Sequence, residues 1–410
     1  MRTSCKALYL DYQSTTPCDA EVLEAMMPYL THHFGNAHSR THCYGWVSEE
    51  SVEEARSQIA KVIGADSKEI IFTSGATESN NLAIKGLAMH LRGQNSPRHK
   101  FVTLATEHKC VLESFRWLQR QGFEVVFLPV QKSGLVDLEQ LEMHLGPETA
   151  LVSIMGVNNE IGVIQPLREI GALCKKYGVF FHSDGAQALG RISLFVKELG
   201  IHLLSLSAHK VYGPKGIGAL YVERRPLRIR LTPLFSGGGQ ERGLRSGTIP
   251  TFLCVGFGVA AEKAEKLRLT ERERLTDLRN QFLERIYSEL PKVYLNGDLE
   301  NRIPDNLNLS FSGVEGEGLL MGIKNLALSS GSACTSESLE PSYVLKAIGV
   351  SEDLAHTSLR ITFGRYTMLN QALEAAEQII VAVKKLRELS PLWDMIMQGV
   401  DLRTVQWIAH

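Results

Sequence analysis

Short apolar runs alternate with amphipathic helical patterns between about residues 50 and 225. The apolar runs read EIIF, KFVTL, FEVVFL, ALVSIM, YGVFF and HLLSLS, and polar or small residues follow each one. This alternation predicts an α/β fold in which crossover helices connect the strands of a mostly parallel sheet. Ligands of such open sheets bind beyond the carboxyl ends of the strands, so chemistry is expected where these runs end.

A second region follows a long, highly charged helical pattern that stops before Pro291. It contains the strand-like runs NLNLSF and SLRITFG, and a helical pattern with Leu373, Ala376, Ile380 and Val383 on one face. With 410 residues, 44% of them hydrophobic, the chain is long enough for two domains.

Composition excludes several classes of protein. The chain carries 44 basic and 45 acidic residues, so its net charge of -1 gives no field that would attract nucleic acid or an anionic membrane. No run of about 18 apolar residues predicts a transmembrane helix. The opening MRTSCKALYLDY lacks the apolar length of a signal peptide, and no clear transit peptide is visible. A soluble protein is therefore expected.

The seven cysteines are scattered singly, without a CxxC pair, at positions 5, 18, 43, 110, 174, 254 and 334. This argues against a disulfide framework or a zinc ribbon and favours a reducing compartment. His38 and His42 are four residues apart in HHFGNAHSRTHC. A structural metal site needs four oriented ligands, and no helical pattern surrounds this pair, so a metal site there is the weakest interpretation.

The turn TSGATESNN places Gly75, Ala76 and Thr77 between a predicted strand and a predicted helix. Free backbone N–H groups and the positive end of a helix can hold a phosphate at such a point. A tight turn without a ligand explains the same small residues and is the commoner case.

The strand end FFHSDGAQ delivers Asp184 and then Gln187, with two small residues between them that would let a flat group approach. A buried carboxylate needs a cationic partner, and a protonated pyridine nitrogen would serve. A helix N-cap is the simpler alternative for Asp184.

The segment SLSAHKVYGPKG places Lys210 at a strand end after Ser207 and His209. A partly desolvated lysine can have a lowered pKa and form an imine with an aldehyde. Ser207 and His209 can bind a phosphate from the same turn. Most lysines are simply solvated, so this interpretation depends on the neighbours of Lys210.

Two further strand ends carry polar side chains, with His108 in ATEHKCV and Asn159 in VNNEIGV. Histidine can move protons near neutral pH and can stack on a ring. A structural role for His108 is an equal alternative. Cys110, two residues on, is interpreted as a buried filler.

Three remaining features lie nearer the carboxyl end. The segment SGGGQERGLRSGTIP, residues 236–250, suits anion binding, with a mobile surface loop as the alternative. Arg360 in SLRITFGR could bind a carboxylate or make an interdomain salt bridge. Cys334 lies in LSSGSACTSESLEPSYV, which has neither helical nor strand periodicity. Small residues and Gly331 predict a supple segment that could carry a reactive thiolate.

Seven motifs occur together and in order: TSGATESNN, TEHK, VNNEIG, HSDGAQ, SAHKVYGPKG, GGGQERGLRSGT and SSGSACTSESLEPSYVL. In these motifs, over nearly the whole chain, the sequence resembles the pyridoxal-phosphate cysteine desulfurases of the IscS/NifS group. The resemblance implies the type I fold of pyridoxal-phosphate-dependent transferases, similar to the class-V aminotransferases. A large cofactor domain would span residues 17–265. A smaller α+β domain would combine residues 1–16 and 266–410, with a mobile catalytic cysteine loop at about 328–340.

The same resemblance implies a role for each candidate residue. Lys210 would hold the cofactor covalently and, with His108, move protons, while His108 stacks on the ring. Asp184 would pair with the ring nitrogen and Gln187 with the ring hydroxyl. The residues implied to bind the phosphate are Ala76, Thr77, Ser207, His209 and, from the other subunit of a homodimer, Thr248. Asn159 would contact the cofactor and, together with Arg360, orient the substrate.

The implied reaction converts L-cysteine to L-alanine and leaves the sulfur on Cys334 as a persulfide. The sulfur would serve iron–sulfur cluster assembly, with tRNA thiolation as a further destination. Cys334 could also contact a cluster transiently, and no resident metal is expected. The ending SPLWDMIMQGVDLRTVQWIAH looks like the mitochondrial type, whose tail contacts the scaffold protein. Frataxin-like and small accessory proteins are further implied partners. This tail favours the mitochondrial matrix or a derived organelle, and the absence of a clear transit peptide leaves a bacterial cytoplasm open.

The sequence departs from the family pattern at three positions. Ala37, Gly185 and Ala208 stand where proline, alanine and glycine are usual. None of these exchanges removes a reacting group, but those at 185 and 208 bear on the position of the ring and on cofactor affinity. Rival interpretations are an aminotransferase or selenocysteine lyase of the same fold, a non-catalytic assembly subunit, and last a metal-binding protein. Cys334 favours the desulfurase, because transamination needs no protein thiol.

Overall fold

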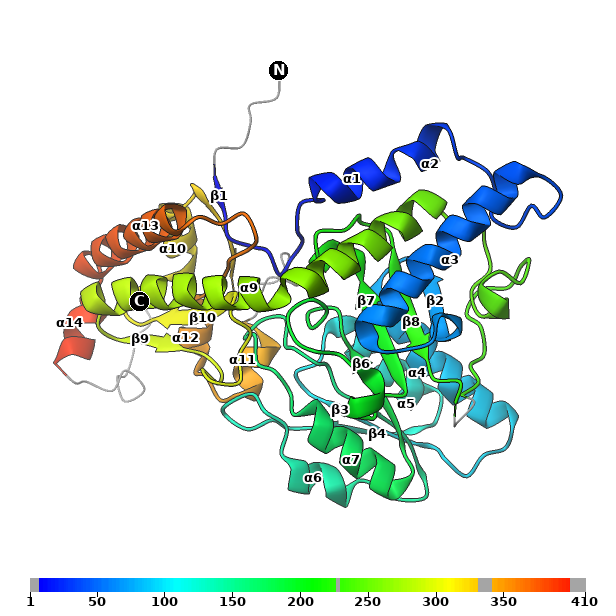
Figure 1. The fold of residues 1–410 in the computed structure, drawn as a ribbon. Helices are drawn as coiled ribbons and strands as arrows, with labels where there is room; N and C mark the ends of the chain where they lie inside the picture. Colours follow the sequence, from blue (N-terminus) through cyan, green and yellow to red (C-terminus); the bar gives the residue numbers. More distant parts are fainter. Residues whose placement is uncertain (1–6, 226–228, 331–340, 399–410) are drawn as a thin grey trace. The chain divides into compact units, whose positions relative to one another are not determined.

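The structure is a computed structural model and describes residues 7–225, 229–330 and 341–398 (Figure 1). The chain divides into two compact units. The large unit comprises Gln13–Asn159 and Val163–Thr270, and the small unit comprises Met1–Tyr12, Glu160–Gly162 and Glu271–His410.

The large unit is built on a sheet of seven described strands in the order β2-β8-β7-β6-β5-β3-β4. Their bounds are Ile70–Thr73 (β2), Lys100–Leu104 (β3), Glu124–Leu128 (β4), Thr149–Ser153 (β5), Phe180–Asp184 (β6), Leu203–Ser207 (β7) and Gly218–Val222 (β8). Strands β3 to β7 pair in parallel, and β8 is antiparallel to both β7 and β2. The predicted mostly parallel sheet is therefore confirmed. All residues of β5, β7 and β8 are buried, which explains their nearly continuous apolar character.

Helices connect and cover these strands. The helices of the large unit are α1 (Ala20–Met26), α2 (Pro28–Thr31), α3 (Cys43–Ile63), α4 (Ala76–Gly93), α5 (Lys109–Arg120), α6 (Leu138–Met143), α7 (Leu167–Tyr177) and α8 (Val196–Leu199), with short 3-10 turns η1 (Ser67–Glu69), η2 (Ala208–Lys210) and η3 (Glu241–Gly243). Leu87 of α4 and Phe115 of α5 share one apolar cluster with Phe101 and Leu151 of the strands, and each is at most 1% exposed. This packing holds α4 and α5 against the sheet, with the amino end of each helix just beyond the strand that precedes it.

The small unit contains an antiparallel sheet in the order β12-β13-β10-β9 and a parallel pair, β1 with β11. The strands are β1 (Leu8–Tyr9), β9 (Val293–Leu295), β10 (Asn306–Phe311), β11 (Leu326–Ala327), β12 (Ser329–Ser330) and β13 (Ser358–Thr362). The helices are α10 (Gly316–Gly322), α11 (Tyr343–Ala347), α12 (Glu352–His356), α13 (Leu369–Glu388) and α14 (Pro391–Met397). Of the predicted apolar face of α13, Ala376, Ile380 and Val383 are buried, whereas Leu373 is only partly buried and Ala372 takes the buried position.

The long charged pattern forms α9, a helix of 39 residues from Thr251 to Glu289 that contributes to both units. Its early residues Cys254 and Phe257 are buried, and its later residues Phe282 and Ile286 belong to the core of the small unit. Within the described ranges, no helix has both the length and the apolar character to cross a bilayer.

Candidate active site

Asp184 is the last residue of β6 and is 6% exposed. Its Oδ1 accepts a hydrogen bond from the backbone N–H of Ala186 at 2.9 Å, and its Oδ2 accepts one from Asn80 Nδ2 at 2.6 Å. No helix begins at Asp184, so the helix N-cap alternative is not realised, although one oxygen binds the following turn. The other oxygen is held by a residue of α4, which fixes the carboxylate at the carboxyl end of the sheet.

Lys210 follows β7, the strand next to β6 in the sheet. Its Nζ donates to the carbonyl oxygens of Gln13 at 2.6 Å and Ser14 at 2.7 Å. Because β6 and β7 are parallel, the side chains that follow them emerge at the same edge. The predicted grouping of Asp184 and Lys210 is what this topology produces.

His108 stands at the start of α5, immediately beyond the carboxyl end of β3. Its Nδ1 lies 3.3 Å from the backbone nitrogen of Cys110, which donates to it, and 3.0 Å from Cys110 Sγ. Burial lowers the pKa of the imidazole, Asp184 raises it, and Lys210 lowers it again. Burial is the largest of these effects, so His108 is neutral near pH 7 and can accept a proton. The capping role and a role in the site are compatible.

Gln187 is 5% exposed and donates its Nε2 to the carbonyl oxygen of Gln13 at 2.9 Å. Its Oε1 is buried and has no hydrogen-bond partner among the described residues, and the same holds for Asn80 Oδ1 beside Asp184. A buried acceptor left unsatisfied costs about 1–3 kcal/mol. A ligand hydroxyl or N–H would remove that cost at Gln187.

The turn before α4 has the form of an anion site. Gly75 caps this 18-residue helix with φ 153° and contributes no side-chain cap, and a Cβ placed on it would meet nothing within 4 Å. Ala76 and Thr77 are the first helical residues, so their N–H groups belong to the positive end of the helix. The sheet register aligns Thr73 with Gly218, and Gly218 with Ser207. Ser207 therefore lies at the same edge as this turn.

His209 adds a polar side chain at the same edge of the sheet, directly after β7. Its Nδ1 lies 3.1 Å from Thr15 Oγ1, and burial, aided by Lys210 and Lys215, lowers its pKa to about 4. It is therefore neutral near pH 7 and available as a hydrogen-bonding group rather than as a charge.

The structure does not bring every predicted residue into this group. Asn159 is buried in the large unit at 6% exposure. Thr248 is exposed, and no hydrogen bond joins it to the other described candidates. Arg360 belongs to the small unit, where its Nη2 donates to Asp11 Oδ1 at 2.7 Å and to Ser329 Oγ at 3.1 Å, so this ion pair lies within one unit. Cys334 lies outside the described residues.

Glu107 is a site residue that sequence reasoning missed. It is fully buried beside His108, and its Oε1 accepts the backbone N–H of Met155 at 2.7 Å. Burial raises its pKa well above the usual range, and Asp184 raises it further, while the bond from Met155 lowers it. A pKa raised in this way favours the protonated form of Glu107. A carboxylate directly after an apolar strand, in the TEHK motif, was the available signal.

Two departures from the family pattern have a packing context. A Cβ at Gly185 would lie 2.8 Å from Leu204 Cδ1 and 3.1 Å from Leu206 Cδ2, so these leucines restrict the space beside Asp184. Ala208 is fully buried, and its Cβ would lie 2.9 Å from a Cβ placed on Gly213. Ala37, the third departure, is 7% exposed.

The segment 236–250 is fastened to the sheet at Glu241. Its carboxylate pairs with Arg56 through two bonds of 2.7 and 2.8 Å and also accepts the backbone N–H of Phe72 at 2.7 Å. Glu241 and Arg242 have φ values of 47° and 57°, a left-handed conformation that is unusual for such residues. The buried ion pair holds this turn in place, so the alternative of a freely mobile loop is not supported at Glu241.

One of the two histidines considered for a metal site has a local structural role. His42 caps α3, its Nδ1 accepting the N–H of Gly45 at 3.3 Å. Searching the described ranges finds no group of three or more His, Cys, Asp or Glu side chains arranged for a metal. Cys110 is partly buried and Cys174 and Cys254 are fully buried, and burial raises the pKa of each thiol, to about 12 for the first two.

Comparison with known proteins agrees with this geometry. Residues 8–373 match the profile of the aminotransferase class-V family. The chain is 56% identical over 403 residues to a cysteine desulfurase IscS of Rickettsia typhi, which covers 98% of this chain and 97% of that protein. It is 57% identical over 409 residues to the mitochondrial cysteine desulfurase of Drosophila melanogaster, covering 100% of this chain and 88% of that protein. A solved structure of SspA in complex with cysteine is 38% identical with a TM-score of 0.76, covering 88% of this chain and 99% of that one.

The chain therefore belongs to the class-V aminotransferases, and within that family to the cysteine desulfurases.

Proposed function

We propose that this protein uses pyridoxal phosphate to convert L-cysteine to L-alanine and transfers the sulfur to Cys334 as a persulfide. One observation carries the proposal: Asp184, Lys210, His108 and Gln187 all follow strands of one sheet at the same edge, beside the open turn of α4. This is the donor set that the cofactor requires, with an amine, a carboxylate, a neutral imidazole and an anion cradle.

The residues present fit the cofactor. The unsatisfied Oε1 of Gln187 can accept the ring hydroxyl, the Asp184 carboxylate can hold a protonated ring nitrogen, and the uncapped start of α4 can bind the phosphate. Ser207 and His209 are proposed to complete the phosphate site, with Thr248 donated by a second subunit. Pyridoxal phosphate, when bound, withdraws electrons from the α-carbon of an amino acid and so acidifies its α-proton.

Different side chains are proposed to carry out the separate proton transfers. Neutral His108 can take the proton of the substrate thiol, because its lowered pKa leaves a free base near pH 7. Lys210 is proposed to move the α-proton, and Asn159 and Arg360 to hold the substrate. The Cys334 thiolate would attack the substrate sulfur, forming an S–S bond as the C–S bond breaks. The electron pair of that bond stays on carbon, which a proton converts to the methyl group of alanine.

Incubation with L-cysteine and a reductant, with alanine and sulfide measured, tests this function. The parent should release both products. Lys210→Ala and Cys334→Ser should each lose at least about 100-fold in activity, while Lys215→Ala and Cys43→Ser, matched controls of the same residue types, should keep it. Full activity in Cys334→Ser, or no product from the parent, would reject the proposal. Transamination with unchanged sulfur would instead indicate the aminotransferase alternative.

A homodimer is also proposed. Large apolar side chains are exposed along the stretch from α1 to the start of α3, namely Leu23 (50%), Met27 (47%), Leu30 (49%), Phe34 (67%), Tyr44 (52%) and Trp46 (55%). A set of this kind is more than the scattered exposure of a monomer and favours a self-interface. Sedimentation should show a dimer that Trp46→Glu weakens, and a monomeric parent would contradict this.

The destination of the sulfur is proposed to be an iron–sulfur scaffold protein, with frataxin-like and small accessory proteins as further partners, in mitochondria or a derived organelle. The similarity to the mitochondrial enzyme of Drosophila melanogaster supports this assignment. Transfer of labelled sulfur from the protein to a purified scaffold protein would test it.

A further inference from the structure

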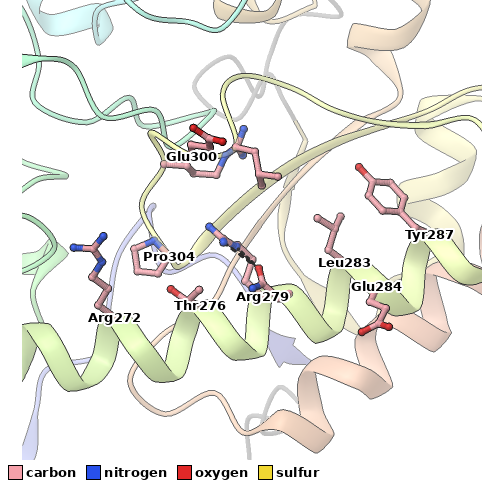
Figure 2. A pocket seen from close by; sticks show the side chains of 11 residues that line it. Arg272, Thr276, Arg279, Leu283, Glu284, Tyr287, Glu300 and Pro304 are labelled. Atoms are coloured by element: carbon pink, nitrogen blue, oxygen red, sulfur yellow. Dashed lines mark hydrogen bonds between the residues drawn. The ribbon is translucent and has the colours of Figure 1, made fainter.

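A pocket of about 620 Å³ lies in the small unit along the later part of α9 (Figure 2). Arg272, Thr276, Arg279, Leu283 and Tyr287 line it from the helix, at successive spacings of three or four residues. The other wall is formed by Leu299, Glu300, Arg302 and Pro304. The volume is within the range of small-molecule sites, about 300–1,000 Å³.

Arg279 is the central polar group of this pocket and is only 8% exposed. Its Nε and Nη2 both donate to Asn280 Oδ1, at 3.2 and 3.0 Å. Among the described residues, its Nη1 has no hydrogen-bond partner, and no carboxylate lies within 4.0 Å of the guanidinium. Burial lowers its pKa, and the more distant Asp305 offsets this only in part. Figure 2 shows the side chain pointing from α9 into the pocket.

Arg302 adds a second buried guanidinium, 5% exposed, to the same pocket. It donates to Asp298 O at 2.8 Å, to Asn306 Oδ1 at 2.9 Å and to the carbonyl oxygen of Asn296. These oxygens are neutral, so they orient the group without cancelling its charge. Burial and the nearby Arg279 lower its pKa to about 9, and Asp298 offsets this only in part. The exposed Arg272 provides a third positive charge.

The charge in the pocket is not balanced by its own acids. Glu284 and Glu300 also line it, but both are exposed and can turn to solvent. A guanidinium taken out of water without a carboxylate is unfavourable unless another anion compensates it. Apolar and aromatic surface lies next to these charges, because Leu299 is 49% and Tyr287 45% exposed.

We propose that this pocket binds a phosphate monoester that carries a ring, such as a nucleoside monophosphate. The phosphate would lie on Arg279 and Arg272, where guanidinium groups can make charge-assisted and bidentate bonds. The Thr276 hydroxyl lies one turn from both arginines and can donate a further bond. The ring would lie against Tyr287, Leu283 and Leu299. This pocket shares no residue with the candidate active site, and the proposal does not depend on the proposed desulfurase reaction.

Titration calorimetry of the cofactor-loaded protein in phosphate-free buffer tests the site, with adenosine 5′-monophosphate and inorganic phosphate as probes. The cofactor absorbance is followed to ensure that its own phosphate site stays occupied. Adenosine monophosphate should bind, more weakly as salt is raised, and Arg279→Gln should weaken binding at least ten-fold. Arg272→Gln, at an exposed position, should weaken it several-fold without risk to folding.

Arg285→Gln is the matched control, because Arg285 lies on the same helix but pairs with Glu289 and Glu377 outside the pocket. It should bind within two-fold of the parent. Tyr287→Ala should weaken adenosine monophosphate several-fold and leave inorganic phosphate unchanged. Absence of binding at millimolar probe, or equal binding by parent, Arg279→Gln and Arg272→Gln, would overturn the proposal. Equal binding of the two probes to the parent would overturn the assignment of the ring.

Discussion

Two buried arginines, one in each unit, have opposite surroundings. Arg56 in the large unit is 3% exposed and forms a bidentate pair with Glu241, whose side chain is 1% exposed. Arg279 in the small unit is 8% exposed and binds only a neutral amide oxygen. The pair with Glu241 raises the pKa of Arg56 despite its burial, whereas burial lowers the pKa of Arg279.

The difference separates a structural charge from a charge available to a ligand. Glu241 compensates Arg56 and in doing so fixes an unusual backbone turn against β2. No described side chain does the same for Arg279, and a pocket opens in front of it. A buried charge is thus informative mainly through what neutralises it.

The largest expected effect comes from removing one member of the paired site. Glu241→Gln should lower the free energy of unfolding by about 3–5 kcal/mol, because a buried guanidinium then lacks its counter-ion. Urea denaturation measures this. Glu113→Gln is the control, since Glu113 and Arg116 form a pair more than half exposed on α5, and its change should stay below about 1 kcal/mol. Equal losses in the two variants would show that the buried ion pair and the exposed ion pair contribute alike to stability.

Removing both members should cost less than removing one. Arg56→Met combined with Glu241→Leu should recover all but about 1–3 kcal/mol, the remainder reflecting the N–H of Phe72 that Glu241 now accepts. A double variant less stable than Glu241→Gln would show that the pair itself, rather than an uncompensated charge, supplies the stability.

Glu223 extends the comparison to a buried acid, since its side chain is 13% exposed and lies 3.9 Å from His202. Burial, with a contribution from Glu69, raises its pKa to about 7. The folded protein therefore holds the Glu223 proton more tightly than the unfolded chain does. The resulting contribution to the free energy of unfolding is complete below about pH 4.5 and is lost as pH rises through 7.

Glu223→Gln should remove this pH-dependent loss of stability. The loss in the parent should be about 1 kcal/mol in the free energy of unfolding between pH 5 and 8, since water screens a partly exposed carboxyl. Burial lowers the pKa of His202 to about 4, which gives the opposite slope below pH 6.5, so the difference between parent and variant isolates Glu223. Parallel stability curves for the two proteins would contradict this assignment.

The smallest effect is expected at the unpaired arginine. Arg279→Met should change the free energy of unfolding by no more than about 1 kcal/mol, because the buried charge it removes is already uncompensated. A loss as large as that of Glu241→Gln in the same urea titration would mean that Arg279 is structural, like Arg56.

Much of the sheet and its polar edge could be predicted from local patterns. The apolar runs gave strands that pair in parallel, and the residues after them, such as Asp184, Lys210 and His108, lie at one edge because parallel strands end together. Arg56 and Glu241 are 185 residues apart, and no spacing rule connects them. Glu107 was hidden for a related reason, since only the structure shows that it is fully buried and that burial raises its pKa. The pocket of Arg279 needs two segments to meet, which periodicity cannot show.

Two of the five described cysteines are buried and a third is partly buried, and this has a consequence for sulfur transfer. Sulfane sulfur passes between thiolates, and a thiol that stays protonated is a poor acceptor. The raised pKa values of Cys110, Cys174 and Cys254 keep these thiols protonated and unreactive near pH 7. In a protein that handles such sulfur, these protonated thiols do not accept it, so persulfides do not form in the buried core.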